Sequence, residues 1–538
     1  MPAAVDALVA ATPYFLPVAI GAACGLIAVC LWKERRSRPR EADVWFAPGG
    51  HSLRTRLVGS LLALFDEEAG EGRKRHARTA VAQGKKAVAY RLMTSYLLEL
   101  VHPQDAWHCL VGSKQQNYVK GPFYEGAELI FGREGLTVIR DDAYHTQQRR
   151  IVSPAFGTGS LRGMAEDVLA DLVRRHVVDA LRAAVACPAA GVDVGVIFDH
   201  AALAIIQRVA FAVGKAPISR DAAAASSDPS RPPSTDAATV SGISGHFRQI
   251  GALVMNHPIA IMPGPIGRIL GFFPRRSIRQ HRDAILETAA NMVRSCRGAT
   301  DAADTLGSDR KTLAEYLVDT PHLTPEAIAG HGLNFLLAGH ETTATTLSWA
   351  CHLLAKHANI QADLYDELFT LIAPHFAVAS NPDALSQDAA PLLNDVISET
   401  LRLYPPCLVL IRQAVRDDVL PSGLVLRAGT QVQIPCYSIH HSNAVWGPDA
   451  DAFRPSRWRD LRQAGRTPPP GAYSPFSLGK RNCIGKDMAL LELRCILASV
   501  VRHFALSLPT PSREPRRRLG ITMRMEEGIR LCVTVRAS

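Results

Sequence analysis

The chain has 538 residues, of which 47% are hydrophobic and 20% are charged. That length exceeds one ordinary domain, and the composition excludes an intrinsically disordered chain and allows a large buried core. The formal net charge is +10, but the basic residues form no long stripe with interleaved aromatic residues, so the charge gives little support to a nucleic-acid-binding protein.

Residues 14–32 are an uncharged stretch that, as a helix, would span about 28 Å, close to the hydrocarbon thickness of a bilayer. The basic run KERRSRPR follows it directly, whereas Asp6 is the only charged side chain before it. The positive-inside rule therefore predicts an uncleaved, single-pass anchor with the rest of the chain in the cytosol. A cleaved signal peptide is the alternative, but the basic residues lie on the wrong side of the apolar stretch for it.

Helices dominate the elements expected in the first half of the chain. In chain order we expect a helix followed by a polar turn (54–86), a strand pair (89–93 and 95–101), a short helix (102–114), a loop-rich region (115–140), a further helix (141–156) and a long stretch with helical periodicity (160–214).

Two segments in the middle of the chain have unusual compositions. Residues 216–239 are low in complexity and predict a disordered surface loop, after which helical sequence resumes near Ser241. Residues 258–273 carry Arg268 as their only charge among apolar residues and prolines. This second segment is either part of the core or an apolar patch that dips into the membrane.

The second half of the chain begins with the clearest helix, residues 324–357. Thr324 is expected to cap it and Pro325 to occupy its first position, and the absence of proline from the rest indicates a long, largely buried helix. A second helix (391–404) is expected to end at a pair of prolines, residues 407–440 alternate as strands do, and residues 441–475 are irregular. The expected fold class is therefore mainly α with a minor β-sheet (α+β).

The chain has eleven cysteines, none in a CxxC pair or beside a histidine at zinc spacing, and most are expected to be reduced, buried side chains. Cys483 differs because it lies in the pattern Phe476-x-x-Gly479-x-Arg481-x-Cys483-x-Gly485, just before a helix-like segment. The glycines would let the backbone turn tightly against a flat cofactor, and the amides of the helix start would stabilise a thiolate. Arg481 could pair with a carboxylate at the cofactor edge, and Phe476 could keep water from the sulfur.

This pattern resembles the haem-binding loop of the cytochrome P450 family, in which a cysteine thiolate is the axial ligand of the haem iron. The resemblance implies that Cys483 binds the iron of haem b. It also implies that Phe476, Gly479, Arg481 and Gly485 form the cofactor-binding loop around it.

A second resemblance lies inside the long helix, at residues 338–343 (AGHETT). An acid beside a hydroxyl residue is unusual there, because Thr342 can bond to the backbone four residues back and Glu341 would be costly to bury unpaired. The stretch is similar to the oxygen-binding groove of the family, which implies that Glu341 and Thr342 deliver protons during oxygen activation.

Two further segments match structural motifs of the family. Glu399-x-x-Arg402 matches its ExxR pair, and residues 453–458 (FRPSRW) match its FxPxRW segment, although Ser456 stands where glutamate is usual. Spacing alone would favour a simple surface ion pair. The resemblance instead implies a buried network of Glu399, Arg402 and Arg457 that supports the cysteine loop.

The run His145-x-x-x-Arg149 resembles the family's helix that meets the haem propionates, with His145 where tryptophan is common. The resemblance implies that Arg149, Arg481 and Arg412 provide positive charge for the two propionates. For His145, a position on the helix surface is the alternative.

The resemblance runs from residue 89 to the end of the chain. His440 stands where the family often has a histidine, but His441 replaces the arginine that usually follows. The anchor, the AGHETT form and the region around residues 118–156 look most like fungal microsomal members. The implied organisation is an N-terminal segment with the anchor (1–32), a basic linker (33–50) and a haem-binding catalytic domain (51–538) that carries the 216–239 insert.

The function that the resemblance implies is a monooxygenase anchored in the endoplasmic reticulum membrane, with its catalytic domain in the cytosol. The chain has no flavin or dinucleotide fingerprint, so two electrons would come from NADPH through a separate flavoprotein reductase, with cytochrome b5 as a further partner. Lys480, Lys486, Arg494 and Arg150 are expected to attract an acidic reductase surface.

Two other functions are weighed against this one. The first is a haem-thiolate isomerase, dehydratase or peroxygenase that needs no reductase, and the presence of both Glu341 and Thr342 favours the monooxygenase over it. The second is a non-catalytic haem sensor or carrier. For the substrate, residues 115–140 and 258–273 are expected to line an apolar entrance, which favours a lipophilic small molecule such as a fatty acid, terpenoid, sterol or aromatic polyketide.

Overall fold

The computed structural model describes Pro39 and residues 42–48, 68, 70–92, 95–164, 168–185, 191–213, 235–262, 268–269, 271–300, 311–371, 382–509, 514–519 and 522–536. The predicted anchor (14–32) lies outside the described residues, as do most of the predicted linker (33–50) and most of the predicted insert (216–239).

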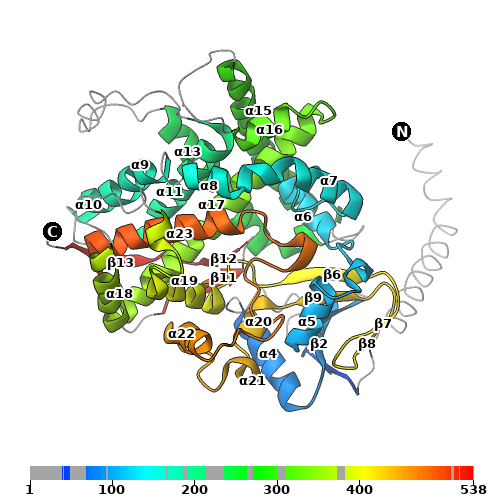
Figure 1. Cartoon of the computed structure of the whole chain (residues 1–538). Coiled ribbons are helices and arrows are strands. Elements are labelled where there is room, and N and C mark those ends of the chain that lie inside the picture. Colours follow the sequence, from blue (N-terminus) through cyan, green and yellow to red (C-terminus); the bar gives the residue numbers. More distant parts are fainter. Residues whose placement is uncertain are drawn as a thin grey trace, which may run out of the picture.

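Helices make up most of the described chain; strands β2 (Ala87–Leu92), β6 (Leu410–Ala414) and β9 (Gln431–Ile434) of the main sheet lie at the lower right, whereas β13 (Arg530–Val535) lies at the opposite side (Figure 1). The α-helices are α4 (Glu71–Ala82), α5 (Pro103–Leu110), α6 (Tyr124–Phe131), α7 (Asp142–Val152), α8 (Thr158–Met164), α9 (Ala170–Val173), α10 (Ala180–Val185), α11 (Val194–Phe211), α13 (Thr235–Asn256), α15 (Phe272–Thr300), α16 (Leu313–Val318), α17 (Pro325–Lys356), α18 (Ala358–Leu371), α19 (Pro391–Leu403), α20 (Cys436–His440), α21 (Asn443–Trp446), α22 (Ser456–Gln463) and α23 (Lys486–His503).

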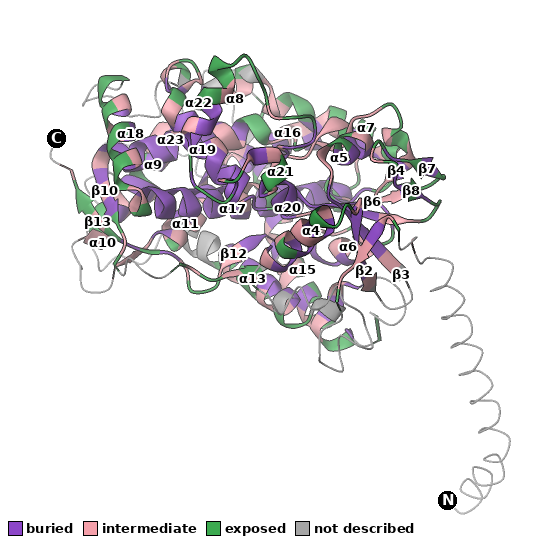
Figure 2. Cartoon of the chain, turned by 90° about the horizontal axis from the view of Figure 1, so that it is seen from below, coloured by how far each residue is buried: buried purple, intermediate pink, exposed green. Residues whose placement is uncertain are grey.

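The predicted long helix is α17, and it forms the centre of the helical part. Thr324 caps it by accepting a hydrogen bond from the Ala327 amide at 3.2 Å, and Pro325 fits the first turn because that position needs no amide donor. Helices α11, α15, α19 and α23 all pack against α17. Figure 2 shows α17 as almost continuously buried and α11 as buried along much of its length, and apolar residues of both helices belong to the main core.

Helix α11 is also long and apolar enough to cross a membrane by length and composition. It is the only such helix within the described part of the chain, and 61% of its apolar window is buried inside the protein. Its contact with α17 accounts for that apolar sequence as a core helix.

The main β-sheet has six strands in the order β1-β2-β3-β9-β6-β4. The predicted strand pair is confirmed, because β2 and β3 pair antiparallel from Ala87 opposite Leu100 to Leu92 opposite Ser95. The sheet consists of β1 (Val44–Phe46), β2 (Ala87–Leu92), β3 (Ser95–Leu100), β4 (Tyr118–Val119), β6 (Leu410–Ala414) and β9 (Gln431–Ile434). Strand β1 comes from the range 33–50 and pairs with β2, so part of that range belongs to the sheet.

Three smaller sheets complete the described strands. A three-stranded sheet has the order β10-β13-β5, and two ribbons are formed by β7 with β8 and by β11 with β12. Their bounds are β5 (Val192–Asp193), β7 (Asp418–Val419), β8 (Val425–Leu426), β10 (Phe504–Ser507), β11 (Arg517–Leu519), β12 (Met523–Met525) and β13 (Arg530–Val535). The expected class, mainly α with a minor β-sheet, is confirmed.

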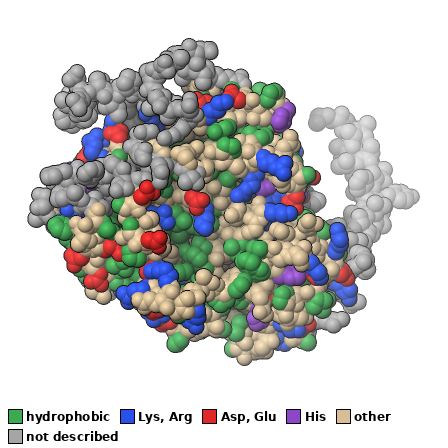
Figure 3. Space-filling model, viewed as in Figure 1, with side chains coloured by type: hydrophobic (Ala, Val, Ile, Leu, Met, Phe, Trp, Pro, Cys, Tyr) green, Lys and Arg blue, Asp and Glu red, His purple; other side chains and the backbone are tan. Residues whose placement is uncertain are grey.

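Three local expectations were wrong in part. The region 115–140 contains helix α6 as well as loops, the strand-like region 407–440 ends in helix α20, and the irregular region 441–475 contains helix α22. Each of these helices is eight residues or shorter, and a short helix gives too few turns for a clear helical period. On the face seen in Figure 3, acidic and basic side chains are interspersed with hydrophobic ones rather than gathered into a basic stripe.

Candidate active site

The loop before α23 places Cys483 at the wall of a cavity. The amide of Cys483 donates to the carbonyl of Phe476 at 2.8 Å, which closes the loop on itself. Gly479 has a φ of 69°, and a Cβ at this position would lie 1.9 Å from the carbonyl oxygen of Leu110. No side chain fits between these two backbones, so glycine is required there for the close approach of the loop to α5.

Gly485, the residue before α23, is different because the protein itself leaves room for a side chain. A Cβ there would meet only Phe156, at 3.8 Å, and Gly485 lines the same cavity as Cys483. The open space at Gly485 therefore faces the cavity, where a flat group could approach the backbone closely.

Burial and neighbouring groups shift the pKa of the Cys483 thiol in opposite directions. Burial raises its pKa, while the Gly485 amide and the Arg149 guanidinium act to lower it. The side chain has accessible surface although protein surrounds it, because the exposed surface faces the cavity rather than the outside. This arrangement offers a sulfur ligand to an occupant of the cavity.

The cavity has a volume of about 320 Å³ and is mostly apolar. Helix α17 forms one wall with Ala338, Gly339, Thr342 and Thr343, and the cysteine loop with the start of α23 forms another. The apolar lining includes Leu136, Phe156, Ile206, Phe335, Leu401, Leu410, Phe476, Ile484, Met488 and Leu493.

Basic side chains gather at one side of this cavity: Lys120, His145, Arg149, Arg412 and Arg481 all line it. Burial lowers the pKa of His145 to about 3, and the neighbouring Arg481, Lys120, Arg149 and Arg412 act in the same direction. Burial, Arg481 and Arg412 likewise hold the pKa of Lys120 well below its usual range. Such mutual repulsion indicates a site that a group with negative charges would neutralise.

The arginines of this group are also tied to the protein. Arg149 donates to the carbonyl and the side-chain oxygen of Asn482, both at 2.7 Å, and so holds the residue next to Cys483. Arg481 donates to Asp142 of α7 at 3.0 Å and to the carbonyl of Ile139 at 2.8 Å.

Arg412 of β6 is held less firmly, by a bond of 2.8 Å to the carbonyl of Ile411 and one of 3.4 Å to the Tyr124 hydroxyl. The structure thus brings all four predicted propionate contacts, His145 included, to one side of the cavity. His145 is buried, so the alternative of a surface position is excluded.

The two residues predicted to handle protons point in different directions. Thr342 lines the cavity, and its hydroxyl donates to the carbonyl of Ala338 at 2.7 Å, the bond expected from the sequence. Glu341 does not line the cavity. Its Oε1 accepts hydrogen bonds from Thr522 and from Arg524 of β12, both at 2.6 Å, while its Oε2 is buried without a partner among the described residues.

Burial opposes the charge of Arg524, but Glu341 outweighs that effect and raises the pKa of the guanidinium above its ordinary value. The ion pair with Arg524 therefore gives the buried Glu341 carboxyl group, which is 2% exposed, a partner of opposite charge.

The predicted support network is present and is centred on Glu399, which is fully buried. Arg402 donates to both of its carboxylate oxygens, at 2.9 and 2.8 Å, and Arg457 donates to Oε1 at 3.3 Å. Arg402 also donates to the carbonyls of His440 and Ala450, each at 2.7 Å. The network therefore joins α19 to the chain that leads into the cysteine loop.

His440 belongs to this framework and does not line the cavity. Its Nδ1 lies 3.1 Å from the carbonyl of Arg402, and its Nε2 accepts from the Ser474 amide at 3.1 Å. His441 is stacked on Tyr437 with 4.2 Å between the ring centroids. Neither histidine is placed to contact an occupant of the cavity.

Sequence reasoning missed two residues of charged type at the cavity, Lys120 and Glu492. Lys120 has no motif that would have revealed it. Glu492 of α23 lines the cavity, its Oε2 has no partner among the described residues, and burial holds its pKa well above the usual range. An acid within the apolar run ALLEL after the cysteine was the available signal for Glu492.

The comparisons with known proteins agree with this geometry. The family model for cytochrome P450 matches residues 56–533. The chain is 30% identical over 401 residues to cytochrome P450 734A5 of Oryza sativa subsp. japonica, which covers 72% of this chain and 68% of that protein. It is 38% identical over 200 residues to the cytochrome P450 monooxygenase sphH of Aspergillus fumigatus, and 37% identical over 215 residues to human cytochrome P450 4F12.

These last two matches cover only 37% and 40% of the respective relatives and of this chain. Among solved structures, the cytochrome P450DA heme domain has the same fold, with a TM-score of 0.71, 20% identity and coverage of 92% of this chain and 98% of that one. The chain belongs to the cytochrome P450 family, which consists generally of haem-thiolate monooxygenases.

Proposed function

We propose that this protein is a membrane-attached monooxygenase that inserts one oxygen atom from O₂ into a lipophilic small molecule. The observation that carries the proposal is the Cys483 thiol, which faces a mostly apolar cavity with a cationic side. These features fit haem: a sulfur for the iron, an open backbone at Gly485 for a flat ring, and basic residues for two carboxylates.

In this proposal Cys483 holds the haem iron and Phe476 keeps water from the sulfur. Arg149, Arg412, Arg481 and His145 bind the haem edge, and Lys120 adds a fifth basic group there. Haem supplies the activation of O₂ when it is bound. The protein orients the substrate along the apolar walls and excludes water from them.

Proton transfer in the proposal uses the α17 wall. The Thr342 hydroxyl can hold a proton at the cavity surface, since it both donates and accepts. Glu341 provides the carboxyl group behind it. Because Oε1 is bonded to Thr522 and Arg524, Oε2 is the oxygen of Glu341 from which a proton could leave.

The electrons in the proposal come from NADPH through a flavoprotein reductase, with cytochrome b5 as a further partner. Lys480, Lys486 and Arg150 are exposed around the cysteine loop and α7, where an acidic partner could dock. Arg494 is less suited to this role, because it is partly buried and donates to Asn394 at 2.6 Å.

The membrane attachment rests on residues 14–32, whose uncharged sequence and basic flank favour a single-pass anchor in the endoplasmic reticulum with a cytosolic catalytic domain. An enzyme held at a bilayer meets lipophilic molecules first, and the apolar cavity lining suits them. Fatty acids, terpenoids, sterols and aromatic polyketides all remain within this class.

The test has two stages. An optical titration of the purified protein in the Soret region, with a panel of these lipophiles, identifies compounds that bind beside the haem. Compounds that shift the spectrum are then incubated with NADPH, reductase and ¹⁸O-labelled O₂. We expect a product that carries one labelled oxygen atom and depends on reductase.

Product without reductase would indicate an isomerase, dehydratase or peroxygenase. Binding without any product would indicate a sensor or carrier. A folded protein with no haem spectrum would overturn the assignment of Cys483, with the Cys483→Ala variant as the reference for absence of the thiolate.

A further inference from the structure

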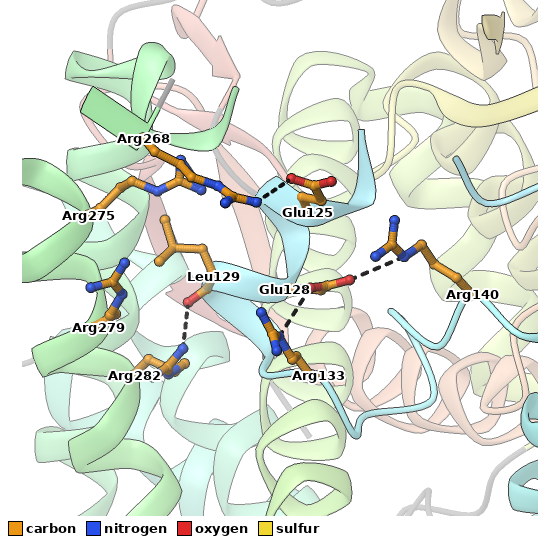
Figure 4. Close-up of a pocket in the computed structure, with 9 residues that line it drawn as sticks. All are labelled: Glu125, Glu128, Leu129, Arg133, Arg140, Arg268, Arg275, Arg279 and Arg282. Carbon is orange, nitrogen blue, oxygen red and sulfur yellow. Dashed lines mark hydrogen bonds and ion pairs between the residues drawn. The ribbon is translucent and has the colours of Figure 1, made fainter. Parts of the chain in front are cut away.

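An arginine-rich pocket lies between α6 and the start of α15, and it shares no lining residue with the cavity at Cys483 (Figure 4). Its volume is about 630 Å³. The lining consists of Leu129, two glutamates and six arginines: Glu125, Glu128, Arg133, Arg140, Arg268, Arg275, Arg279 and Arg282. The proposed monooxygenase reaction uses none of them.

The two glutamates neutralise only part of this charge. Glu128 lies 3.5 Å from Arg133 and 3.3 Å from Arg140, and Glu125 lies 3.2 Å from Arg268 (Figure 4). The pocket keeps a formal surplus of four positive charges among its lining residues. Such a concave surface attracts anions.

The other three arginines lie on one face of α15. Arg275, Arg279 and Arg282 follow the spacing i, i+4 and i+7, which places them one above another on a helix. Arg282 contacts Asp283 at 2.6 Å and the carbonyl of Leu129 at 3.4 Å. Arg279 is exposed and has no ion-pair partner among the described residues.

Arg275 is the lining residue that most clearly lacks a partner for its guanidinium group. Its side chain is 7% exposed, and its hydrogen bond to the carbonyl of Met262 is long, at 3.4 Å. Burial lowers the pKa of its guanidinium, and Arg279 and Arg268 act in the same direction. A buried guanidinium has five donors, so Arg275 retains unused donors for an anion.

The start of α15 adds to the positive potential. Its first turn contains no acidic residue, although the positive end of a helix normally favours one. Arg275 stands there instead. An anion in the pocket would compensate both the helix end and the Arg275 side chain.

Large apolar side chains are exposed directly beside the pocket. Ile269 follows Arg268 and is 72% exposed, while Phe272 and Phe273 precede Arg275 and are 56% and 79% exposed. An exposed apolar cluster next to basic residues is typical of a surface that enters the interface of a bilayer.

We propose that this pocket binds the phosphate headgroup of an anionic membrane lipid while Ile269, Phe272 and Phe273 enter the acyl region. The guanidinium forks of Arg275 and Arg279 match phosphate geometry, and the apolar cluster favours a lipid over free phosphate. The proposal extends the proposed membrane attachment but depends neither on residues 14–32 nor on haem chemistry. Its failure would leave the monooxygenase assignment intact.

The test is a calorimetric titration of the full-length protein in a neutral detergent. The probes are a short-chain phosphatidic acid, phosphatidylcholine with the same chains, and inorganic phosphate. The main variant is Arg279→Gln, which removes an exposed pocket guanidinium. Arg276→Gln is the matched control, because it removes an exposed arginine of the same helix that does not line the pocket.

We expect phosphatidic acid to bind at least about ten-fold more tightly than either other probe, and Arg279→Gln to weaken it about ten-fold. Arg276→Gln should change the affinity by less than about two-fold. Glu125→Gln should tighten binding, because it removes a competing carboxylate from Arg268. Phe273→Ser should weaken the lipid and leave inorganic phosphate unaffected.

Three results would overturn the proposal. Equal affinity for inorganic phosphate and phosphatidic acid would make this a site for free anions. Equal effects of Arg279→Gln and Arg276→Gln would show that the helix charge, not the pocket, attracts the lipid. Equal binding of phosphatidylcholine would show that the headgroup charge is irrelevant. Circular dichroism of each variant confirms that its helices are retained.

Discussion

Glu399 provides the sharpest test of the framework behind the cysteine loop. Five hydrogen bonds converge on its carboxylate: two from Arg402, one each from the side chains of Arg457 and Trp458, and one from the Arg454 amide at 3.1 Å. The Glu399 carboxylate accepts all five, and Glu399 has no exposed surface. In the Glu399→Gln variant, one of the two acceptor oxygens becomes an amide that faces the Arg402 guanidinium with its own donors.

The expected cost follows from the loss of charge compensation. Removing one partner of a buried ion pair destabilises a protein by about 3–5 kcal/mol, because the remaining charge stays buried. Here Arg402 loses the carboxylate to which it is bonded twice, whereas Arg457 keeps Asp449 at 3.2 Å, so we expect a value within that range. Urea unfolding followed by circular dichroism measures the change as a lower midpoint with an unchanged slope.

A matched control is available in the exposed ion pair of Arg427 and Asp417, 2.7 Å apart, whose side chains are 70% and 56% exposed. Asp417→Asn should cost less than about 1 kcal/mol. Trp458→Phe removes a single charge-assisted hydrogen bond, 3.0 Å long, and should cost about 1.5–3 kcal/mol. If Glu399→Gln costs no more than Asp417→Asn, the network does not hold this region together.

Three further predictions concern residues near the cavity. Burial raises the pKa of Glu492 in the folded state alone, so the Glu492→Gln variant should become more stable relative to the wild type as pH rises above the usual carboxyl pKa, by up to about 1.4 kcal/mol per pH unit. Urea unfolding at about pH 5 and about pH 8 measures this difference. A difference that does not change with pH would contradict the prediction. Thr342→Val should lower product formation on the order of a hundred-fold with an unchanged haem spectrum, measured as product per NADPH consumed, whereas equal yields would remove Thr342 from proton transfer. Arg524→Gln should destabilise the protein by about 3–5 kcal/mol by leaving Glu341 buried without its cation, and a loss below about 1 kcal/mol in urea unfolding would show that the ion pair is dispensable.

The parts of the fold set by local sequence were the parts that could be predicted. The α17 helix has its cap, its proline at the first position and thirty apolar-rich residues in one continuous segment, and the β2–β3 pair is separated by only two residues. Helix α22 was missed, because its eight residues include four charged side chains and follow a proline-containing stretch. Such a composition is equally typical of a loop.

In the candidate site, too, the residues that lie in short motifs could be predicted, whereas those brought in by tertiary packing could not. Cys483, Thr342 and Arg149 were identified because each lies in a short motif, and the structure brings all three to one cavity. Lys120 joins them only through tertiary packing. Arg524 meets Glu341 across 183 residues of chain, and no local pattern indicates which arginine pairs with a given acid over that distance.

The geometry of α17 explains why the two predicted proton-handling residues separate. Consecutive residues of an α-helix point about 100° apart, and the cavity-lining face of α17 includes Ala338, Gly339, Thr342 and Thr343, which leaves Glu341 at the edge of that face. Thr342 takes the cavity side, and Glu341 turns toward the C-terminal ribbon, where Thr522 and Arg524 stabilise its charge. An acid that faced the mostly apolar cavity would lose that compensation. The ribbon thus provides partners for Glu341 beside the cavity without exposing it there, and any proton that it delivers must pass from Oε2 around the helix to the Thr342 hydroxyl.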